Sequence, residues 1–525
     1  MKAPLDLESL VDFGMDNFQE NYFWPSSSDL YDKIAMENLE FLFKVHDEAV
    51  YDKRDLMRLA FRQMFLDFNY FSTNYLDVFL ARNAGREPVC GQSSRIYKSI
   101  ISDNYSPAPP SMALDSLSLK EKLKNIVRPI VKKQKMLNEI NKAGSNVCFT
   151  NGLSKAINEY CRENDFPVPV SVPNYFFSKA PAYSFREEKV LEEARRIASG
   201  WRKIIEERAG KMSPAAFKYM KSIAEYYLSW AWRDMFKKEP FPLNNTVFIV
   251  GTGGGYWNRM IGFKVQKAGG KVIRMDHGGE RPFYVDRWWG VNEFAFCDIF
   301  VTFSREGAKA IKTNLDKEYR SLLDCSLRLK VSYLQNSSFN VLRDKQARDK
   351  LPDKIKSIMF VPTGFQGEFN STPSFTAHDV PYASFQIQIL QALRKSGLKT
   401  LYKQAPKAYV EALFKPEKYG AETVGGYLSE CLALTDAFLF TFIGTAFCEA
   451  MCTDKPVLLI QAPPLRPMLG GEKEELGKAC RIIKCSADKD NRLVLNEKEL
   501  LGNLGSMTGE ELKGRKQFRD KWLLH

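Results

Sequence analysis

The chain has 525 residues, 44% of them hydrophobic and 26% charged, and carries a formal net charge of +13 at pH 7. This length exceeds what one ordinary hydrophobic core accommodates, and the composition is typical of globular protein, which excludes wholesale disorder. The positive charge suits an anionic partner. However, Lys and Arg alternate with acids, as in REEKVLEEARR at 186–196, which is typical of a solvated helix face and not of a nucleic-acid footprint.

The sequence lacks both common membrane signals. Its longest apolar stretch, around 437–447, falls short of the about 20 residues that a membrane-spanning helix needs. The N-terminal residues are acidic early and show no basic-then-apolar signal pattern. We therefore expect a cytoplasmic protein, with no nucleic acid among its partners.

The 10 cysteines show no CxxC pair and no His/Cys spacing that suits a metal. Several of them lie in apolar segments, where a free cysteine packs as a small hydrophobic residue. We expect neither a disulfide framework nor a metal site.

Residues 1–240 have mainly helical patterning. Apolar residues recur there at three- and four-residue spacing in four segments: 35–50, 55–83, 184–208 and 213–237. The segment 166–178, FPVPVSVPNYFFS, is too rich in proline for a central strand and predicts an extended connector.

From residue 245 onward, short apolar runs alternate with helical segments. This order predicts the α/β class: two Rossmann-like units, each with a parallel sheet and helices on both faces. The polar segment 335–354 predicts a linker between the units. The expected strands are 246–250, 271–275 and 298–304 in the first unit, and 356–362, 398–404, 436–442 and 456–461 in the second.

The residues that follow these strands are rich in glycine, hydroxyl and ionisable groups. Ligands of open parallel sheets bind outside the carboxyl ends of the strands, so these ends predict a ligand site, although βα turns often contain glycine for structural reasons alone. The segment after the first expected strand, GTGGG at 251–255, lacks the G-x-G-x-x-G spacing. This weakens the interpretation of the protein as a dinucleotide oxidoreductase. Its amides at Gly253 and Gly254, with Arg259, remain candidates for contact with an anion.

The second unit contains the segment FIGTAFCEAMCTDKPVLLI. Gly444 and Thr445 leave a strand and open a helix, where they are candidates to hold a diphosphate, and Glu449 is placed to accept hydrogen bonds from a ribose or sugar diol. The alternative is that Thr445 only caps the helix and Glu449 only favours its positive end. Lys403, just after another strand, is a candidate to neutralise phosphate, or else a solvated lysine.

The strand followed by HGG in the first unit, together with DAFLFTFIGTAFCEAMCTDKPVLL at 436–459, resembles GT-B glycosyltransferases, and more narrowly the bacterial transferases of capsule and O-antigen synthesis. The resemblance covers about 245–465. It implies two Rossmann-like domains that face each other across a cleft, with no metal and no cofactor besides the nucleotide-sugar substrate. The donor contacts that it implies are Gly364, Gln366, Gly444, Thr445 and Glu449.

The resemblance also implies a domain layout. The acceptor side would be 241–335, the donor side 355–505, and 506–525 would form a final helix that returns to the first domain. Residues 1–240 match no part of the family pattern, and whether they belong to the acceptor domain stays open.

An inverting transfer needs a general base near the acceptor hydroxyl. His277 in the DHGGE turn is the leading candidate because its unperturbed pKa lies near neutrality. Asp276 and Glu280 are the alternatives, either as the base or as the carboxylate that orients His277. A retaining reaction would instead need a carboxylate nucleophile, and a purely structural turn is the remaining alternative.

We therefore expect a metal-independent glycosyltransferase that moves a sugar from a nucleotide-sugar donor to a surface polysaccharide or glycoconjugate. Its acceptor would be a glycan or a lipid-linked molecule, with peripheral association at the inner face of the membrane. The alternatives are a CDP-alcohol phosphotransferase of similar fold and a non-catalytic protein that binds carbohydrate or nucleotide.

Overall fold

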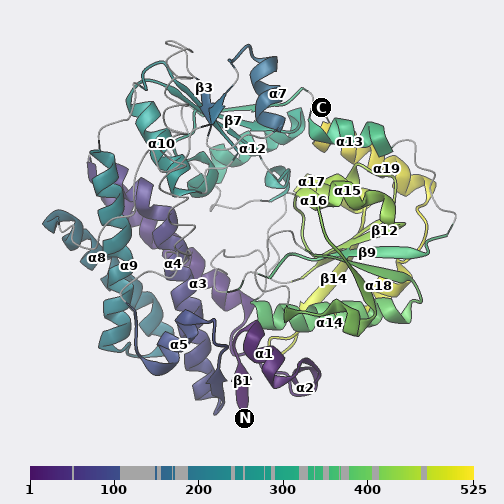
Figure 1. Cartoon of the computed structure of the whole chain (residues 1–525), viewed down its shortest axis with the longest axis horizontal. Helices are drawn as coiled ribbons and strands as arrows, with labels where there is room; N and C mark the ends of the chain where they lie inside the picture. Colours follow the sequence, from purple (N-terminus) through teal and green to yellow (C-terminus); the bar gives the residue numbers. More distant parts are fainter. Residues whose placement is uncertain are drawn as a thin grey trace, which may run out of the picture.

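A mainly helical N-terminal region and two α/β units make up the protein (Figure 1). None of the described helices combines the length and the apolar character that a membrane span requires. The computed structural model describes residues 1–49, 52–106, 148–150, 155–167, 169–171, 187–237, 243–251, 255–276, 278–284, 290–318, 329–335, 337–346, 354–365, 367, 378–404, 413–462 and 470–524.

Four long helices form the body of the N-terminal region, where they lie side by side (Figure 1). Trp201 is fully buried between them: its ring stacks on Phe68 at 4.7 Å, and its indole N–H donates to Asn38 at 2.8 Å. The two short strands β1 (Lys2–Pro4) and β2 (Glu87–Val89) pair in parallel. The helices are α1 (Leu7–Phe13), α2 (Met15–Glu20), α3 (Ser28–Glu48), α4 (Asp52–Asn83), α5 (Arg95–Ser102), α8 (Glu188–Ala209) and α9 (Pro214–Met235).

The first α/β unit contains a six-stranded parallel sheet in the order β4-β3-β5-β6-β7-β8. Its helix α10 (Tyr256–Lys267) packs on α4 and α9, and α12 (Arg305–Glu318) packs on β8 and on the C-terminal segment. A third helix is α7 (Lys155–Glu163). The strands are β3 (Cys148–Thr150), β4 (Val170–Ser171), β5 (Val247–Val250), β6 (Lys271–Met275), β7 (Ile299–Thr302) and β8 (Lys330–Tyr333).

Two strands of this sheet, β3 and β4, come from the region expected to be mainly helical. The boundary expected at residue 241 therefore lies inside the first unit. The proline-rich segment 166–178 supplies β4, which lies at the sheet edge, where proline is tolerated because one side of the strand has no ladder partner.

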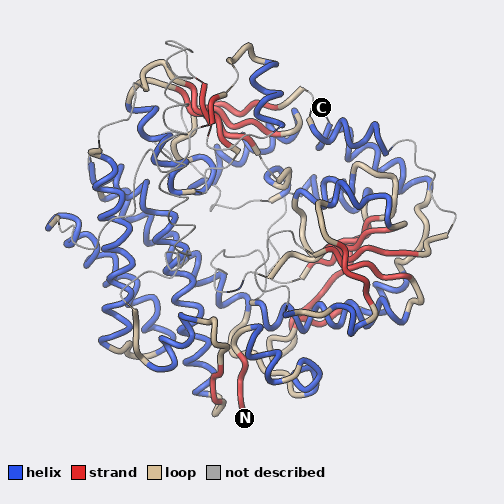
Figure 2. The backbone as a smooth tube through the Cα atoms, viewed as in Figure 1, coloured by secondary structure: helices blue, strands red, loops and turns tan. Residues whose placement is uncertain are grey.

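The second unit contains a seven-stranded sheet in the order β11-β10-β9-β12-β13-β14-β15, parallel except for the last pair. The strands of the two α/β units form two separate groups in Figure 2. Helices α14 (Asp379–Lys395) and α18 (Glu497–Gly502) lie together on one side, and α15 (Leu428–Cys431), α16 (Thr445–Met451) and α17 (Gly470–Ala479) on the other (Figure 1). The two α/β units and the helical region predicted from the sequence are confirmed. The strands are β9 (Ser357–Val361), β10 (Lys399–Lys403), β11 (Ala421–Val424), β12 (Ala437–Phe440), β13 (Val457–Gln461), β14 (Arg481–Ala487) and β15 (Leu493–Leu495).

The segment 335–354, expected to be a linker, contains helix α13 (Ser338–Gln346). Phe339 in this helix is buried and its ring lies 4.7 Å from that of Phe303 in the first unit. The linker expectation is therefore wrong over α13, where Phe339 is buried and Leu342 also packs against the hydrophobic core.

The C-terminal segment, α19 (Gly509–Arg519) and the π-helical turn η10 (Asp520–Leu524), joins the two units. Phe518 and Trp522 pack on Phe283 of the first unit, with ring centroids 5.4 and 5.7 Å away. The hydroxyl of Ser337, which precedes α13, donates to the backbone oxygen of Leu523 at 3.3 Å.

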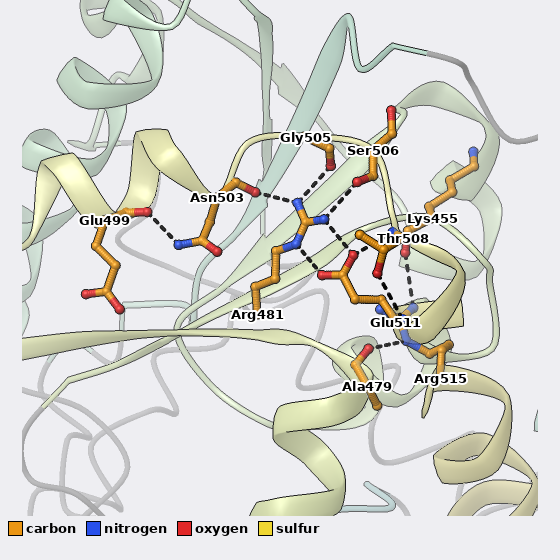
Figure 3. A network of polar contacts seen from close by, with 10 residues as sticks. All are labelled: Lys455, Ala479, Arg481, Glu499, Asn503, Gly505, Ser506, Thr508, Glu511 and Arg515. Atoms are coloured by element: carbon orange, nitrogen blue, oxygen red, sulfur yellow. Dashed lines mark hydrogen bonds and ion pairs between the residues drawn. The ribbon is translucent and has the colours of Figure 1, made fainter. Parts of the chain in front are cut away.

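Two arginines fix α19 to the second unit (Figure 3). Arg481 makes a two-point ion pair with Glu511, at 2.6 and 2.8 Å, and also donates to the backbone oxygens of Asn503, Gly505 and Ser506. Arg515 is fully buried and donates to the backbone oxygens of Ala479, Thr453 and Lys455. Planar guanidinium groups suit such multiple contacts, so α19 is held by charge-assisted hydrogen bonds as well as by packing.

Candidate active site

The second sheet has its topological switch point between β9 and β12. The chain runs from β9 outward to β10 and β11, and then returns to β12 on the other side of β9. Because ligands of open α/β sheets bind outside the carboxyl ends of the strands at such a point, the loops 362–367 and 441–444 are the expected ligand loops.

A tyrosine from α14 connects these two loops. The hydroxyl of Tyr382 accepts from the Thr363 backbone N–H at 2.9 Å and pairs with the Thr441 hydroxyl at 2.7 Å. The side-chain oxygen of Thr363 is buried and has no hydrogen-bond partner in the structure. Buried hydroxyls are usually paired because an unpaired one is costly, so Thr363 is unusual among the described residues at the switch point. Gly364 follows it directly, and Gln366 lies outside the described residues.

Glu449 and Lys403 lie beside this switch point, close enough for the lysine charge to act on the carboxyl. Burial raises the pKa of the half-buried Glu449 carboxyl to about 7, while a hydrogen bond from the Ser429 backbone and the Lys403 charge act against this rise. The Lys403 ammonium donates to the backbone oxygens of Gly426 at 2.5 Å and Gln404 at 3.0 Å. Lys403 is only 5% exposed, so the solvated-lysine alternative is wrong.

Gly444 and Thr445 lie where the sequence predicts, at the start of α16. Gly444 is the residue that precedes the helix and no side chain caps it, so the alternative in which Thr445 serves as a cap is wrong. Thr445 is exposed at the carboxyl edge of β12.

In the first unit, Asp276 is buried and shapes the DHGGE turn. One carboxylate oxygen accepts from the backbone N–H groups of Gly278 and Gly279, at 3.1 and 3.2 Å, and the other accepts from the Thr302 hydroxyl at 3.2 Å. These contacts give Asp276 a positioning role in the turn. His277 itself lies outside the described residues.

Glu280 is also buried, at 6% exposure. It pairs with Arg281, whose guanidinium also lies 3.2 Å from Glu293. One Glu280 oxygen makes no hydrogen bond within the described part of the chain, and a side chain added at Gly278 would have to displace this carboxylate.

The DHGGE turn lies directly against α16 of the second unit. Gly279 has φ +73°, and an added Cβ there would come within 3.2 Å of the Cys448 sulfur. Next to it, the rings of Tyr284 and Phe442 stack with centroids 6.3 Å apart. The structure thus brings together the two motifs that the sequence singled out, one from each unit.

The sequence predicts that Arg259, after the GTGGG loop, contacts an anion, and this prediction is wrong. This side chain is fully buried and donates to the Leu59 backbone oxygen at 2.8 Å and to the Gln63 side chain, both on α4. Burial lowers its pKa well below the usual value, and two neighbouring arginines add to this. Arg259 therefore binds the helical region and not a phosphate. Gly253 and Gly254 lie outside the described residues.

The sequence did not reveal a buried cluster around Asp77 of α4. Its carboxylate accepts from the hydroxyls of Ser26, Tyr31 and Tyr97, at 2.7, 2.5 and 2.9 Å. The imidazole nitrogen Nδ1 of His378, at the start of α14, lies 3.6 Å away. Burial raises the pKa of Asp77, and the nearby His378 opposes the rise.

A signal for this cluster does exist in α4. Polar residues recur at Asp67, Tyr70, Asn74 and Asp77, a spacing that places them on one face of a helix whose other positions are largely apolar. Across the described residues, no group of three or more His, Cys, Asp or Glu side chains comes together as a metal site would require.

No known protein-family model matches the chain, and no curated protein matches it. Two solved structures that it resembles are from plants. Phytolacca americana UGT2, complexed with UDP-2fluoro-glucose and pterostilbene, is 13% identical, with a TM-score of 0.30 over 52% of this chain and 69% of that one. Arabidopsis thaliana UGT89C1, complexed with UDP, is 12% identical, with a TM-score of 0.35 over 74% and 91%. At these scores the likeness carries no argument, and the fold rests on the strand orders described above.

Proposed function

We propose that the protein is a glycosyltransferase that moves a sugar from a nucleotide-sugar donor to a hydroxyl group of an acceptor. The observation that carries this proposal is the composition of the switch point in the second unit. A buried hydroxyl without a partner, a carboxyl with a pKa of about 7 and a buried lysine lie at or beside the strand ends where such sheets bind ligands.

The donor is held by the second unit in this proposal. Lys403 supplies positive charge for the diphosphate, and the Thr363 hydroxyl donates a hydrogen bond to the donor. Gly364, Gln366, Gly444 and Thr445 allow close approach at the loop backbone. Glu449 accepts hydrogen bonds from a diol of the donor, for which its ionised form is the better acceptor.

The acceptor hydroxyl is activated from the DHGGE turn. In an inverting transfer the acceptor oxygen attacks the anomeric carbon, the bond from that carbon to the diphosphate breaks, and the hydroxyl proton passes to a base. His277 is the proposed base, and Asp276 positions it through the turn that its carboxylate fixes. Glu280 is the alternative base. The acceptor is a surface polysaccharide or glycoconjugate, and transfer takes place in the cytoplasm, at the inner face of the membrane if the acceptor is lipid-linked.

The deciding experiment measures thermal stabilisation by UDP, GDP, dTDP, CDP and CMP. A nucleotide at a hundredfold excess over its Kd stabilises a folded protein by about 2.7 kcal/mol, which shifts the melting temperature by an easily measured amount. Glu449→Gln should reduce the shift. Glu497→Gln is the matched control, because Glu497 lies on the surface in an ion pair with Lys395 and should leave the shift unchanged. If no nucleotide stabilises the protein, the proposal fails.

A second measurement separates transfer from its rivals. Purified protein incubated with nucleotide-sugars and glycan acceptors should release nucleoside diphosphate, and His277→Ala should stop this release while it preserves the thermal shift. Release of CMP from a CDP-alcohol would instead support a phosphotransferase. Full stabilisation without any turnover would support a binding protein.

A further inference from the structure

A cavity of about 60 Å³ lies between the helical region and the second unit. It is several times larger than the roughly 10–15 Å³ that a single water needs, but smaller than the about 150 Å³ that encloses a benzene ring, so this partly open cavity has room for one edge of a sugar ring. Figure 1 shows the elements that enclose it, β1, α1, α4, α5 and the start of α14, converging near the N-terminus. Its described lining residues are Leu5, Asp6, Leu7, Glu8, Tyr70, Asn74, Ser93, Ser94, Tyr97, Gly367, His378, Asp379 and Leu413.

Two polar side chains in this lining have a buried atom without a partner. The amide nitrogen of Asn74 and the hydroxyl of Ser94 make no hydrogen bond, although the two residues are only 1% and 2% exposed. Nearly all buried polar groups in proteins are paired, because leaving one unpaired is costly in free energy. Two such groups in one cavity indicate a site for a molecule that supplies the missing partners.

Ser94 lacks the structural role that its position normally provides. It is the residue that precedes α5, where a serine side chain usually accepts from the first turn of the helix, but it makes no such bond. By contrast, Ser27 before α3 and Ser213 before α9 do accept from their helices. Ser94, which lines the cavity, therefore makes no capping bond to its own helix.

The charge of the lining identifies the chemistry of the ligand. Three carboxylates line the cavity, from Asp6, Glu8 and Asp379, and no Lys or Arg is among the described lining residues. A phosphate or diphosphate would be repelled there. Carboxylates accept from hydroxyl groups, while an amide N–H₂ and a serine hydroxyl donate to hydroxyl oxygens. Leu5, Leu7 and other apolar side chains complete the wall, as suits the C–H face of a sugar ring.

The cavity borders the proposed donor site. The backbone N–H of Gly367, at the end of the switch-point loop 362–367, donates to the Asp379 carboxylate at 2.7 Å. We infer that the cavity binds one edge of a neutral glycosyl unit and serves as an acceptor-side subsite that holds part of the glycan. The acceptor role rests on the proposed function, whereas the binding of a neutral sugar does not.

The test uses the full chain and measures saturation transfer by NMR from the protein to D-glucose, D-galactose, N-acetyl-D-glucosamine and myo-inositol. At least one should receive signal, and Ser94→Ala should weaken its binding about fivefold to tenfold, the loss expected for one or two hydrogen bonds. The melting temperature of ligand-free Ser94→Ala should not fall, because the hydroxyl has no protein partner to lose.

Two further variants complete the design. Asn74→Leu should weaken sugar binding similarly, and if it fails to fold, Ser94→Ala decides alone. Ser222→Ala is the control: this hydroxyl donates to the Tyr219 backbone within α9 and is not among the described lining residues, so sugar binding should be unchanged.

Competition distinguishes the cavity from the donor site. UDP and inorganic phosphate should not displace the sugar. The inference is overturned if none of the four probes receives signal, if Ser94→Ala and Ser222→Ala bind the sugar equally, or if UDP displaces it. If no nucleotide stabilises the protein while sugar binding still depends on Ser94, the proposed function fails and the sugar site stands.

Discussion

The two α/β units have similar chain topologies, but the carboxylates that follow their strands differ in burial and in hydrogen bonding. In each sheet the chain starts at an inner strand, extends to one side and then crosses to the other. In the first unit, Asp276 and Glu280 are buried and engaged by the turn and by Arg281. In the second, Glu449 stays half-buried with a pKa of about 7. The carboxylates of the first unit thus build a turn, while Glu449 keeps the environment that the proposed donor role requires.

The largest expected effect is on the first unit. Asp276→Ala removes the acceptor for two backbone N–H groups and the Thr302 hydroxyl, all buried, so we expect a loss of about 2–4 kcal/mol in the free energy of unfolding. Urea denaturation at pH 7 measures this. A loss below about 1 kcal/mol would mean that Asp276 does not stabilise the turn, and its role would then not differ from that of Glu449.

The next effect concerns Glu511, a structural carboxylate of the second unit. Arg481→Met removes its ion pair and three contacts to backbone oxygens, and should cost about 2–3 kcal/mol. Hydrogen bonding from Arg481 lowers the pKa of Glu511 to about 2, so its stabilising contribution is complete above about pH 4.5 and is lost as the pH falls toward 2. Acid titration of stability should lose this component in Arg481→Met. An unchanged acid profile would mean that the pair is not formed.

A smaller effect on the free energy of unfolding, with the opposite dependence on pH, is expected for Glu449. Because burial raises its pKa from 4.5 to about 7, its contribution to stability is complete below pH 4.5 and is lost as the pH rises through 7. Relative to Glu449→Gln, the wild type should lose about 1–3 kcal/mol between pH 4.5 and 8. Nucleotide affinity should rise over the same range in the wild type alone. Parallel stability curves for the two proteins would contradict the raised pKa.

The smallest effect on stability is expected at Thr363. Thr363→Val removes a hydroxyl that has no protein partner, so the free energy of unfolding should change by less than about 0.5 kcal/mol, while nucleotide affinity falls about fivefold. Calorimetric titration with the stabilising nucleotide measures the affinity. A destabilisation without a change in affinity would assign the hydroxyl to the fold.

The central strands were predictable because they are continuous apolar runs, as in Val247–Val250 and Ala437–Phe440. The outer strands were not: Lys330–Tyr333 and Ala421–Val424 carry polar residues because they are only partly covered. Continuous hydrophobic runs identify strands that are buried on both faces of a sheet, and they do not identify the partly exposed strands at its edges.

The positions of Gly444 and Glu449 at the start of a helix were predictable from the local sequence, whereas their roles in donor binding stay predictions. The site was not predictable where a distant helix decides the environment. Arg259 follows a glycine-rich loop, yet α4 buries it, and Asp77 meets His378 across two regions far apart in the sequence. Such contacts depend on how the helical region packs, and no local pattern describes that packing.

The C-terminal segment has a mechanical consequence. Arg515 and Arg519 bind the backbone of the turn that follows α16, at Cys452–Lys455, while Phe518 and Trp522 grip Phe283, three residues after Glu280. The C-terminal segment thus contacts both units behind the DHGGE turn and α16, the two elements that flank the proposed reaction centre. If one unit rotated relative to the other, these contacts of α19 and η10 would have to shift. The spacing between the DHGGE turn and α16 therefore depends on C-terminal residues that have no part in the proposed donor or acceptor sites.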